Sequence, residues 1–340
     1  MSSSKTSRIA ARNKLQSSNS APNPLFPLRT TFDARELKPS PNGSVVSVGV
    51  FDGVHLGHRA ILRANIERAR ELNAESTVLT FRRHPKTILL GRAPRTLTTL
   101  EHRLELFQRA GIEHAVALTF DEELRQLSAE DFAERYLVKA LGARALVLGF
   151  DSKFGHGRRG TPALMTELGY DVEVVEPLVI AGRAISSTAI REAVELGDSN
   201  SSQAMLGRPV SVIGRVVRGD AIGRTIGFPT ANLDLHHELH PPLGVYATQA
   251  RILGEQTGDS PNAEVLRSVT NIGFRPTVAN EQPTTPRVEV HIFDFDRDIY
   301  GKRLEISFIK RLRGEQRFDD LDGLVAQIKL DCEEARAVFD

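Results

Sequence analysis

Residues 44–58 read SVVSVGVFDGVHLGH, and this stretch decides the fold of the first half of the chain. It opens with a short, β-branched and nearly continuous apolar run, which is typical of a strand buried on both faces of a parallel sheet. The dipeptide Asp52-Gly53 then interrupts the run with a turn signal. Beyond the turn, apolar residues recur at helical spacing, at Leu62, Ile66 and Ala69. The stretch therefore predicts a strand, a tight glycine turn and the start of a helix.

A helix that begins directly after such a turn offers a site for phosphate groups. Its first N–H groups have no partners within the helix and carry about half a positive charge between them. Gly53 and Gly57 allow the backbone to approach a bulky ligand closely. His55 and His58, three residues apart, can bring two imidazoles to a triphosphate and to the charge that grows on a leaving pyrophosphate. The alternative is an ordinary helix cap with two surface histidines.

Composition bounds the class of protein. The chain has 340 residues, of which 40% are hydrophobic and 26% charged, which is typical of a globular protein of more than one domain. A net charge of +1 and the absence of tryptophan speak against a nucleic-acid partner, and no apolar run is long enough to predict a membrane span. The single cysteine, Cys332, excludes a disulfide framework and favours a reducing compartment, the cytoplasm.

Two polar segments flank residues 41–197. Residues 1–40 are rich in Ser, Asn, Pro and basic residues and predict a disordered basic tail. The first 32 residues lack acidic side chains, so an organelle transit peptide is the alternative for this segment. Residues 198–206 begin with a polar, turn-rich run, and we expect them to be the linker between two domains.

The two long segments differ in the kind of strand they predict. In residues 41–197 strand and helix patterns alternate, which predicts a parallel sheet with its ligand at the carboxyl ends of the strands. Residues 100–110 are one of the helices expected there. In residues 207–340 closely spaced β-type runs with glycine turns predict a small antiparallel barrel. A final helix is expected from about residue 321 to 338, with Cys332 on its apolar stripe.

Residues 185–191, ISSTAIR, are a second candidate phosphate site in the first module. Ser and Thr before a helical run are N-cap residues, and that is the simplest interpretation of Ser187 and Thr188. A capped helix start with two hydroxyl groups and Arg191 also binds phosphate oxygens well. The segment therefore predicts either a helix cap alone or a cap that also holds a nucleotide.

Residues 223–233, GRTIGFPTANL, are the densest motif of the second module. Its glycines, Gly223 and Gly227, expose backbone N–H groups that can form a nest for phosphate. Thr230 and Asn232 lie two apart on an extended segment, so a hydroxyl and an amide oxygen face the same side. Both are ligands of the kind that Mg²⁺ takes beside nucleotide phosphates. The alternative is a Gly-Pro turn, and the glycine spacing is not that of a Walker A loop.

Together these motifs resemble those of the prokaryotic bifunctional riboflavin kinase/FAD synthetase family. GxFDGVHxGH at residues 49–58 is similar to its nucleotidyltransferase signature, ISSTxIR to its ATP site and GRxxGFPTAN to its flavokinase motif. Further matches occur in the family's order at residues 244–246, 271–277 and 289–291. The chain departs from the family pattern at Arg83 and at Ser152, which leaves a weakened adenylyltransferase as one outcome.

The resemblance implies a Rossmann-like nucleotidyltransferase domain, a flavokinase barrel and two reactions that use ATP and Mg²⁺. The barrel would phosphorylate riboflavin to FMN, and the first domain would adenylylate FMN to FAD. Glu289 is the implied general base of the kinase, and Arg313 and Phe318 are implied flavin contacts. The implied nucleotide contacts, besides the catalytic His55 and His58, are Phe51, Asp52, Gly53, Gly57, Asp151, Ser187, Thr188, Arg191, Gly223, Arg224, Gly227 and Pro229. For Asp151 a simple turn role is the alternative.

Two other functions stay open at this point. One is a nucleotidyltransferase with another acceptor, such as a phosphopantetheine or nicotinamide mononucleotide, and the Pro-Thr-Ala-Asn motif of the second module argues against it. The other is a flavin sensor that kept the folds and lost the chemistry. A sensor would have no need for the joint presence of His55, His58, Thr230, Asn232 and Glu289.

Overall fold

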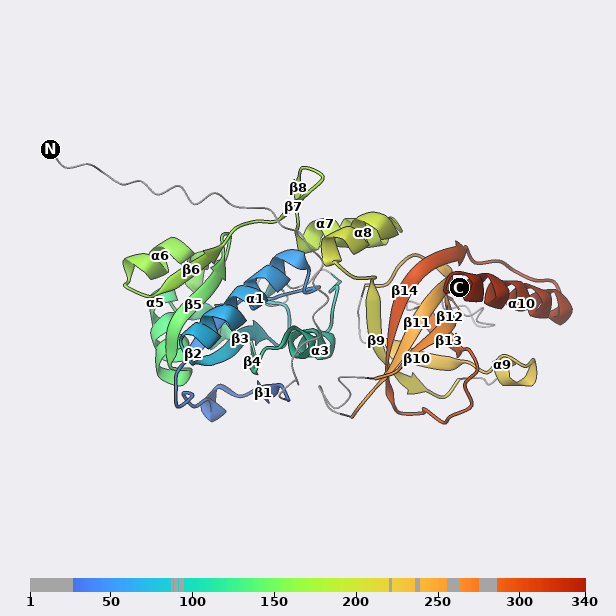
Figure 1. Cartoon of the computed structure of the whole chain (residues 1–340), viewed down its shortest axis with the longest axis horizontal. Coiled ribbons are helices and arrows are strands. Elements are labelled where there is room, and N and C mark those ends of the chain that lie inside the picture. The colour runs from blue at the N-terminus through green and yellow to red at the C-terminus, as the bar shows by residue number, and fades with distance from the viewer. Residues whose placement is uncertain are drawn as a thin grey trace.

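The computed structural model describes residues 27–340 except 87, 89, 90, 92–94, 220, 221, 236–238, 256–262 and 275–285. It shows two modules that lie side by side along the long axis of the molecule (Figure 1). The first is a parallel sheet between helices, and the second is a closed antiparallel barrel that carries a C-terminal helix. The predicted fold class, a Rossmann-like α/β domain followed by a small barrel, is confirmed.

Six parallel strands form the first sheet in the order β1-β4-β3-β2-β5-β6. All five residues of β2 are buried, as its apolar run predicts. From β2 the chain adds β3 and β4 on one side and then β5 and β6 on the other, so the strand order reverses beside β2. Ligands of open α/β sheets bind at such a point, beyond the carboxyl ends of the strands. The strands are β1 Arg29–Thr31, β2 Ser44–Val48, β3 Glu75–Phe81, β4 His114–Leu118, β5 Ala143–Gly149 and β6 Val172–Val175.

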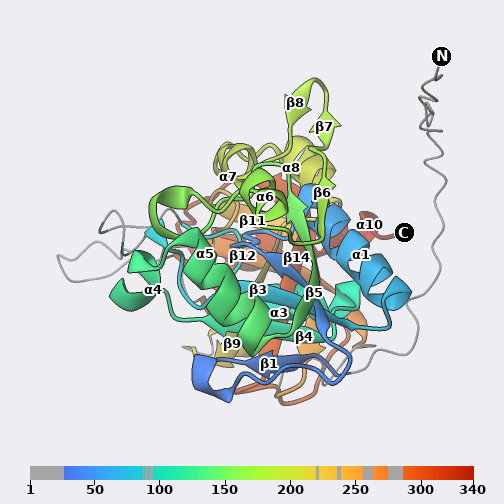
Figure 2. The same ribbon diagram turned by 90° about the vertical axis from the view of Figure 1, so that its left-hand side faces the viewer.

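Helices cover both faces of this sheet (Figure 2). Leu62 of α1 and Phe107 of α3 belong to the core on one face, and Leu137 and Met165 belong to the core on the other. The helices are α1 Leu56–Glu71, α3 Leu100–Ala110, α4 Glu122–Gln126, α5 Ala129–Phe132 with a π-helical continuation Ala133–Ala140, and α6 Pro162–Glu167. Two 3₁₀ turns, Ala34–Glu36 and His156–Arg158, and a hairpin of β7 Val179–Ile180 and β8 Arg183–Ala184 complete the module. Helix α3 spans the residues expected for it.

The segment before β2 is folded where the structure describes it. β1 pairs with β4 at the edge of the sheet, Leu28 is buried, and Arg29 binds Glu75 at 2.8 Å. The prediction of a disordered tail over residues 1–40 is therefore wrong for residues 27–40. The polar composition gave no sign of β1, because this strand forms only by pairing with β4, where Arg29 lies opposite His114, 85 residues further along the chain.

The expected linker, residues 198–206, is a helix. α8 (Ser199–Leu206) comes after α7 (Ser187–Glu195) and packs against it through Met205 and Leu206. Asp198 caps α8 by accepting a hydrogen bond from the N–H of Ser201 at 2.9 Å. The prediction failed because Asp and Ser are turn formers and also preferred N-cap residues, and only packing decides between the two roles.

The second module is a six-stranded barrel in the order β10-β13-β12-β11-β14-β9, closed because β9 pairs with both β14 and β10. Its strands are β9 Ser211–Val217, β10 Ala231–Leu235, β11 Gly244–Leu253, β12 Val265–Gly273, β13 Arg287–Ile292 and β14 Arg303–Arg313. Short helix α9 (Ile222–Thr225) precedes β10, and α10 (Leu321–Ala337) packs on the barrel. Cys332 of α10 is buried in that contact, as predicted for a core residue. Among the described residues, no helix is long and apolar enough to cross a bilayer.

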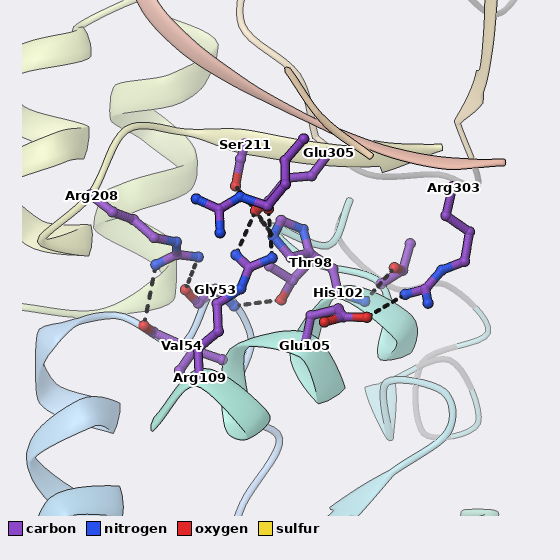
Figure 3. Close-up of polar contacts among 12 residues, drawn as sticks. Gly53, Val54, Thr98, His102, Glu105, Arg109, Arg208, Ser211, Arg303 and Glu305 are labelled. Atoms are coloured by element: carbon purple, nitrogen blue, oxygen red, sulfur yellow. Dashed lines mark hydrogen bonds and ion pairs between the residues drawn. The ribbon is translucent and has the colours of Figure 1, made fainter. Parts of the chain in front are cut away.

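An ionic cluster joins the two modules, shown in Figure 3. Glu305 of β14 accepts two hydrogen bonds from Arg109 of α3, at 3.0 and 2.6 Å, and lies 3.6 Å from Nε2 of His102. Arg303 of the same strand binds Glu105 of α3 at 2.6 Å. Both barrel side chains are almost fully buried, so the modules meet here across paired charges. A separate apolar contact lies beside them, where Leu239 of the second module packs with Leu97 and Ile190 of the first.

We expect Glu305 to make the stability of the fold depend on pH. Burial by itself raises the pKa of Glu305, but hydrogen bonds from His102 and Arg109 outweigh it and hold the pKa well below its usual range. The unfolded carboxyl titrates near 4.5, so the stabilisation is complete above that pH and is lost as the pH falls below it. Urea unfolding near neutral pH should show Glu305→Gln to be less stable than wild type by roughly 3 kcal/mol.

That difference in the free energy of unfolding should shrink when the titration is repeated at about pH 4, because the carboxyl of unfolded wild-type Glu305 then begins to take up a proton. Glu130→Gln, an exposed change on α5, is the matched control and should change neither value. A difference that stays constant between the two pH values would contradict the assignment of the pH dependence to Glu305.

Candidate active sites

The turn between β2 and α1, residues 49–55, is called the signature turn because it lies within the signature motif. It begins at the carboxyl end of β2 and leads into α1. His55 is the N-cap of α1, and its Nδ1 accepts a hydrogen bond from the backbone N–H of His58 at 3.3 Å. The two imidazole rings stack with their centroids 3.6 Å apart. Because Nδ1 of His55 is the acceptor, its ring proton is assigned to Nε2, which leaves that N–H free to donate elsewhere.

Both imidazoles are neutral near pH 7. Burial lowers the pKa of His55 to about 4, with Asp52 opposing this effect and Arg208 adding to it. Burial also holds the pKa of His58 well below its usual value, and the neighbouring His55 and Arg103 add to the effect. The pair can therefore offer hydrogen bonds to a phosphate ligand but brings no positive charge of its own.

Asp52 is the buried centre of this site. Its carboxylate accepts hydrogen bonds from the backbone N–H groups of Leu97 (3.2 Å) and Thr98 (3.1 Å), and it forms an ion pair with Arg191 (2.7 Å). Its backbone carbonyl accepts a hydrogen bond from the Ser187 hydroxyl at 3.0 Å. Three predicted nucleotide contacts thus come together, and the charge of Arg191 is shared with Asp52. Thr188, beside them in the first turn of α7, is exposed.

The turn itself holds a demanding backbone conformation. Phe51 and Val54 have φ values of 53° and 38°, and each such residue costs about 1–3 kcal/mol. Gly53 has a φ of 82°, and a Cβ there would lie 2.8 Å from Cδ1 of Leu97, so glycine is required. Its N–H donates to Oγ1 of Thr98 at 2.8 Å. The surrounding structure, not local preference, holds this turn in place.

Gly57 and Asp151 lie at the same edge of the sheet. A Cβ on Gly57 would lie 3.3 Å from the His55 ring, so the glycine leaves room for the imidazole. Asp151 is exposed in the turn after β5, which the N–H of Ser152 closes by donating to the carbonyl of Gly149 at 2.9 Å. This turn follows β5, which lies next to β2 at the place where the strand order reverses.

Strand register assembles the site of the barrel. Asn232 of β10 lies directly opposite Glu289 of β13, which lies directly opposite Asn271 of β12. Residues opposite each other in antiparallel strands have Cβ atoms about 5 Å apart and face the same side of the sheet. All three line one cavity of about 480 Å³, together with Thr230. The last part of the motif that begins at Asn271, residues 275–277, lies outside the described residues.

A second cavity of about 480 Å³ adjoins the first. Arg224 and Pro229 line it, with the loop between β13 and β14 at residues 295–300. Thr230 lines both cavities. The motif glycines shape the segment that leads to these cavities: the N–H of Phe228 donates to the carbonyl of Gly223 at 2.7 Å, and Gly227 has a φ of 89°. Gly223 itself lines the first cavity.

Arg313 and Phe318 lie at the end of the first cavity that α10 covers. The guanidinium of Arg313 binds the buried carboxylate of Asp331 through two hydrogen bonds, at 2.8 and 2.7 Å. It also lies over the ring of Phe318 at 5.9 Å. The pair with Asp331 thus holds a cation and an aromatic ring together at the cavity wall.

Two family models match the chain in this order. The FAD synthetase model matches residues 37–189, and the riboflavin kinase model matches residues 206–339. A bifunctional riboflavin kinase/FMN adenylyltransferase of Haemophilus influenzae is 37% identical over 87% of this chain and 94% of the relative. The proteins of that description from Escherichia coli strain K12 and Bacillus subtilis strain 168 are 38% and 36% identical, over 93% and 92% of their lengths. The chain belongs to this family.

A solved structure shares the two-module architecture of this family member. It is described as a macrolide-efflux protein from Streptococcus pneumoniae and is 32% identical in sequence, with a TM-score of 0.76. The match covers 92% of this chain and 99% of that chain, so the likeness extends over both modules.

The sequence patterns do not point to three residues of this chain that lie beside the predicted site residues: Thr98, Arg103 and Asp331. Arg103 is buried beneath the signature turn and donates to the carbonyls of Val50 (2.6 Å) and Phe81 (2.9 Å). Burial lowers its pKa to about 10, so it stays charged. Residues 100–110, LEHRLELFQRA, carry several charged residues, so Arg103 does not stand out among them. Asp331, an acid within the apolar stripe of α10, is the available signal. Thr98 carries no such signal.

We predict that neither signature histidine takes up a proton as the pH falls from about 8 through the usual histidine pKa near 6.5. Burial lowers the pKa of His55 to about 4 and holds the pKa of His58 well below its usual value. Two-dimensional NMR of the imidazole groups, with signals assigned by His55→Gln, should show constant shifts for both rings. A midpoint near 6.5 for His55 or His58 would show that the pair is not buried in solution.

Proposed function

We propose that the chain makes FAD from riboflavin in two ATP-dependent reactions, one in each module. It is an enzyme with a riboflavin kinase and a FAD synthetase domain, and its substrates are riboflavin, FMN and ATP. The kinase converts riboflavin and ATP to FMN and ADP, and the synthetase converts FMN and a second ATP to FAD and pyrophosphate. The observation that carries the proposal is that each module brings its predicted site residues together at one place.

We assign residues 41–197 to FMN adenylylation and residues 207–340 to riboflavin phosphorylation, joined by residues 198–206 that contain α8. The ranges of the two family models support these limits. We also propose that the enzyme works in the cytoplasm, where both ATP and a reduced thiol at Cys332 are expected.

In the kinase, Glu289 acts as general base toward the terminal ribityl hydroxyl of riboflavin. Its carboxylate takes the proton while the hydroxyl oxygen bonds to the γ-phosphorus of ATP, and the bond from that phosphorus to the ADP oxygen breaks. The register that sets Glu289 beside Asn232 supports this role. Arg313 and Phe318 contact the flavin at the other end of the cavity, where Asp331 holds the guanidinium.

Thr230 and Asn232 suit a Mg²⁺ ion. A hydroxyl and an amide oxygen line the same cavity, and two protein ligands leave room for the phosphate oxygens and waters that this ion keeps. When bound, the ion would neutralise charge on the phosphates of ATP. We place the ATP of the kinase along the motif, in contact with Gly223, Arg224, Gly227 and Pro229. Arg224 and Pro229 line the second cavity, and Gly223 lines the first.

In the synthetase, an oxygen of the FMN phosphate attacks the α-phosphorus of ATP, and the bond to pyrophosphate breaks. The nucleophile is already anionic, so no enzyme base is needed. The N-terminus of α1 and the neutral imidazoles of His55 and His58 offer N–H donors to the departing pyrophosphate. Asp52 positions Arg191 and Ser187 for the nucleotide. The remaining proposed nucleotide contacts are Phe51, Gly53, Gly57, Asp151 and Thr188.

Chromatographic analysis of products tests this function. Purified protein is incubated with ATP and Mg²⁺ and either riboflavin or FMN, and we expect FAD from both mixtures. FMN as the only product from riboflavin would indicate that the departures at Arg83 and Ser152 have silenced the synthetase. Riboflavin that is bound but unchanged would indicate a flavin sensor instead.

We predict that two substitutions separate the reactions. His58→Ala should lower FAD formation from FMN by about 100-fold, because it removes a donor for the charge on pyrophosphate, and should leave FMN formation unchanged. Glu289→Gln should lower FMN formation from riboflavin by about 10²- to 10⁴-fold and leave FAD formation from FMN unchanged. Each rate is measured with the same protein preparation and saturating ATP.

The matched controls are His156→Ala and Glu333→Gln, which alter exposed side chains of the same types outside both sites. Neither control should change either rate. The assignment of two separate sites fails if His58→Ala or Glu289→Gln abolishes both activities in a protein that remains folded.

A further inference from the structure

Arg208 reaches from the kinase module to the signature turn of the synthetase module (Figure 3). It lies between α8 and β9, inside the range matched by the riboflavin kinase model. Its Nη2 donates to the carbonyl oxygen of Gly53 at 2.8 Å, and its Nη1 lies 3.3 Å from the carbonyl oxygen of Val54. The second module thus holds two consecutive peptide groups of the first module's active site.

These two carbonyl groups lie directly before a proposed catalytic residue. Gly53 and Val54 both have positive φ, and the next residue, His55, caps α1 and carries the proposed catalytic imidazole. A planar guanidinium that binds two adjacent carbonyls fixes the orientation of both peptide planes. Thr98 holds the opposite side of the same turn through the N–H of Gly53. Without Arg208, the contacts of Asp52 and of the Gly53 N–H would remain, but the carbonyl groups of Gly53 and Val54 would lose the side chain that orients them.

The contact between the modules keeps Arg208 in place. Ser211, three residues further on in the chain, lies 3.2 Å from Nε2 of His102 in α3. Arg109 of the same helix binds Glu305 of the barrel. Because α3 comes directly after the loop that contains Thr98, one helix locates both the turn and the segment that carries Arg208.

We propose that Arg208 is a positioning residue for FMN adenylylation, by which the kinase module completes the geometry of the synthetase site. It acts on His55 through the backbone of Gly53 and Val54 and does not contact substrate. The inference rests on the proposed function of the His55 site. It predicts that a change in the second module damages the reaction of the first while its own reaction continues.

The test compares Arg208→Gln and Arg208→Lys with Arg144→Gln in the full chain. Arg144 is the matched control because it makes the same kind of contact, to the carbonyl oxygens of Leu72 (2.8 Å) and Asn42 (3.3 Å), at the opposite end of the sheet. For each variant, kcat and KM are measured for FAD formation from FMN and for FMN formation from riboflavin. Thermal unfolding and the NMR signals of the His55 ring are recorded on the same samples.

Arg208→Gln should lower kcat for FAD formation by about 10- to 100-fold, because a misplaced catalytic group costs rate even where substrate still binds. The KM for ATP should change much less, and FMN formation should keep its wild-type rate. Arg208→Lys keeps the positive charge but loses the planar pair of N–H donors, so its kcat for FAD formation should lie between those of wild type and Arg208→Gln. The His55 signals should shift in both Arg208 variants and stay in place in Arg144→Gln.

The proposal is overturned if Arg208→Gln forms FAD at the rate of Arg144→Gln. It is equally overturned if both reactions and the unfolding temperature fall together, since that result shows only a structural role. Should Arg208→Gln fail to fold, Arg208→Lys is judged by the same criteria. A wild-type protein that makes no FAD would instead refute the proposed function itself.

Discussion

The ion pair between Arg109 and Glu305 sets the relation between the two halves of this molecule. It joins α3, whose preceding loop holds the signature turn, to β14, whose far end carries Arg313 at the cavity of the barrel. Both sites are thus attached to elements that meet at this pair. With Arg303 and Glu105 beside it, the contact consists of charges that lose their partners if the modules shift.

Such a contact favours one arrangement more than it stabilises the fold. Paired charges buried at an interface give back little of their desolvation cost, whereas an unpaired buried charge costs several kcal/mol. Most apolar packing lies between the sheet and its helices and inside the barrel, and a smaller apolar cluster joins Leu239 of the second module to Leu97 and Ile190 of the first. The ionic contact therefore contributes mainly orientation, and Arg208 makes use of that orientation at the signature turn.

Neighbouring segments hold the site around Asp52 and His55 in its conformation. The imidazoles of His55 and His58 are neutral, Asp52 and Arg191 neutralise each other, and the turn carries two non-glycine residues with positive φ. Hydrogen bonds from α3's leading loop and from Arg208 hold this arrangement. Under the proposed function, positive charge for a triphosphate would come from the N-terminus of α1 and from the nucleotide's own counter-ions.

The sequence by itself determined the elements whose patterns are local. The buried strand β2, helix α3, most barrel strands and α10 are predictable from hydrophobic periodicity, and the motifs mark both sites because each lies within a dozen consecutive residues. Only the tertiary structure decided that β1 belongs to the sheet, that α8 is a helix, that Asp331 binds Arg313 and that Arg208 binds the carbonyl of Gly53. The physical reason is the separation of the partners along the chain. Arg208 binds Gly53, which lies 155 residues earlier, and Asn232 lies opposite Glu289 only because of the strand register. Contacts of that kind depend on how the modules pack, which no local pattern encodes.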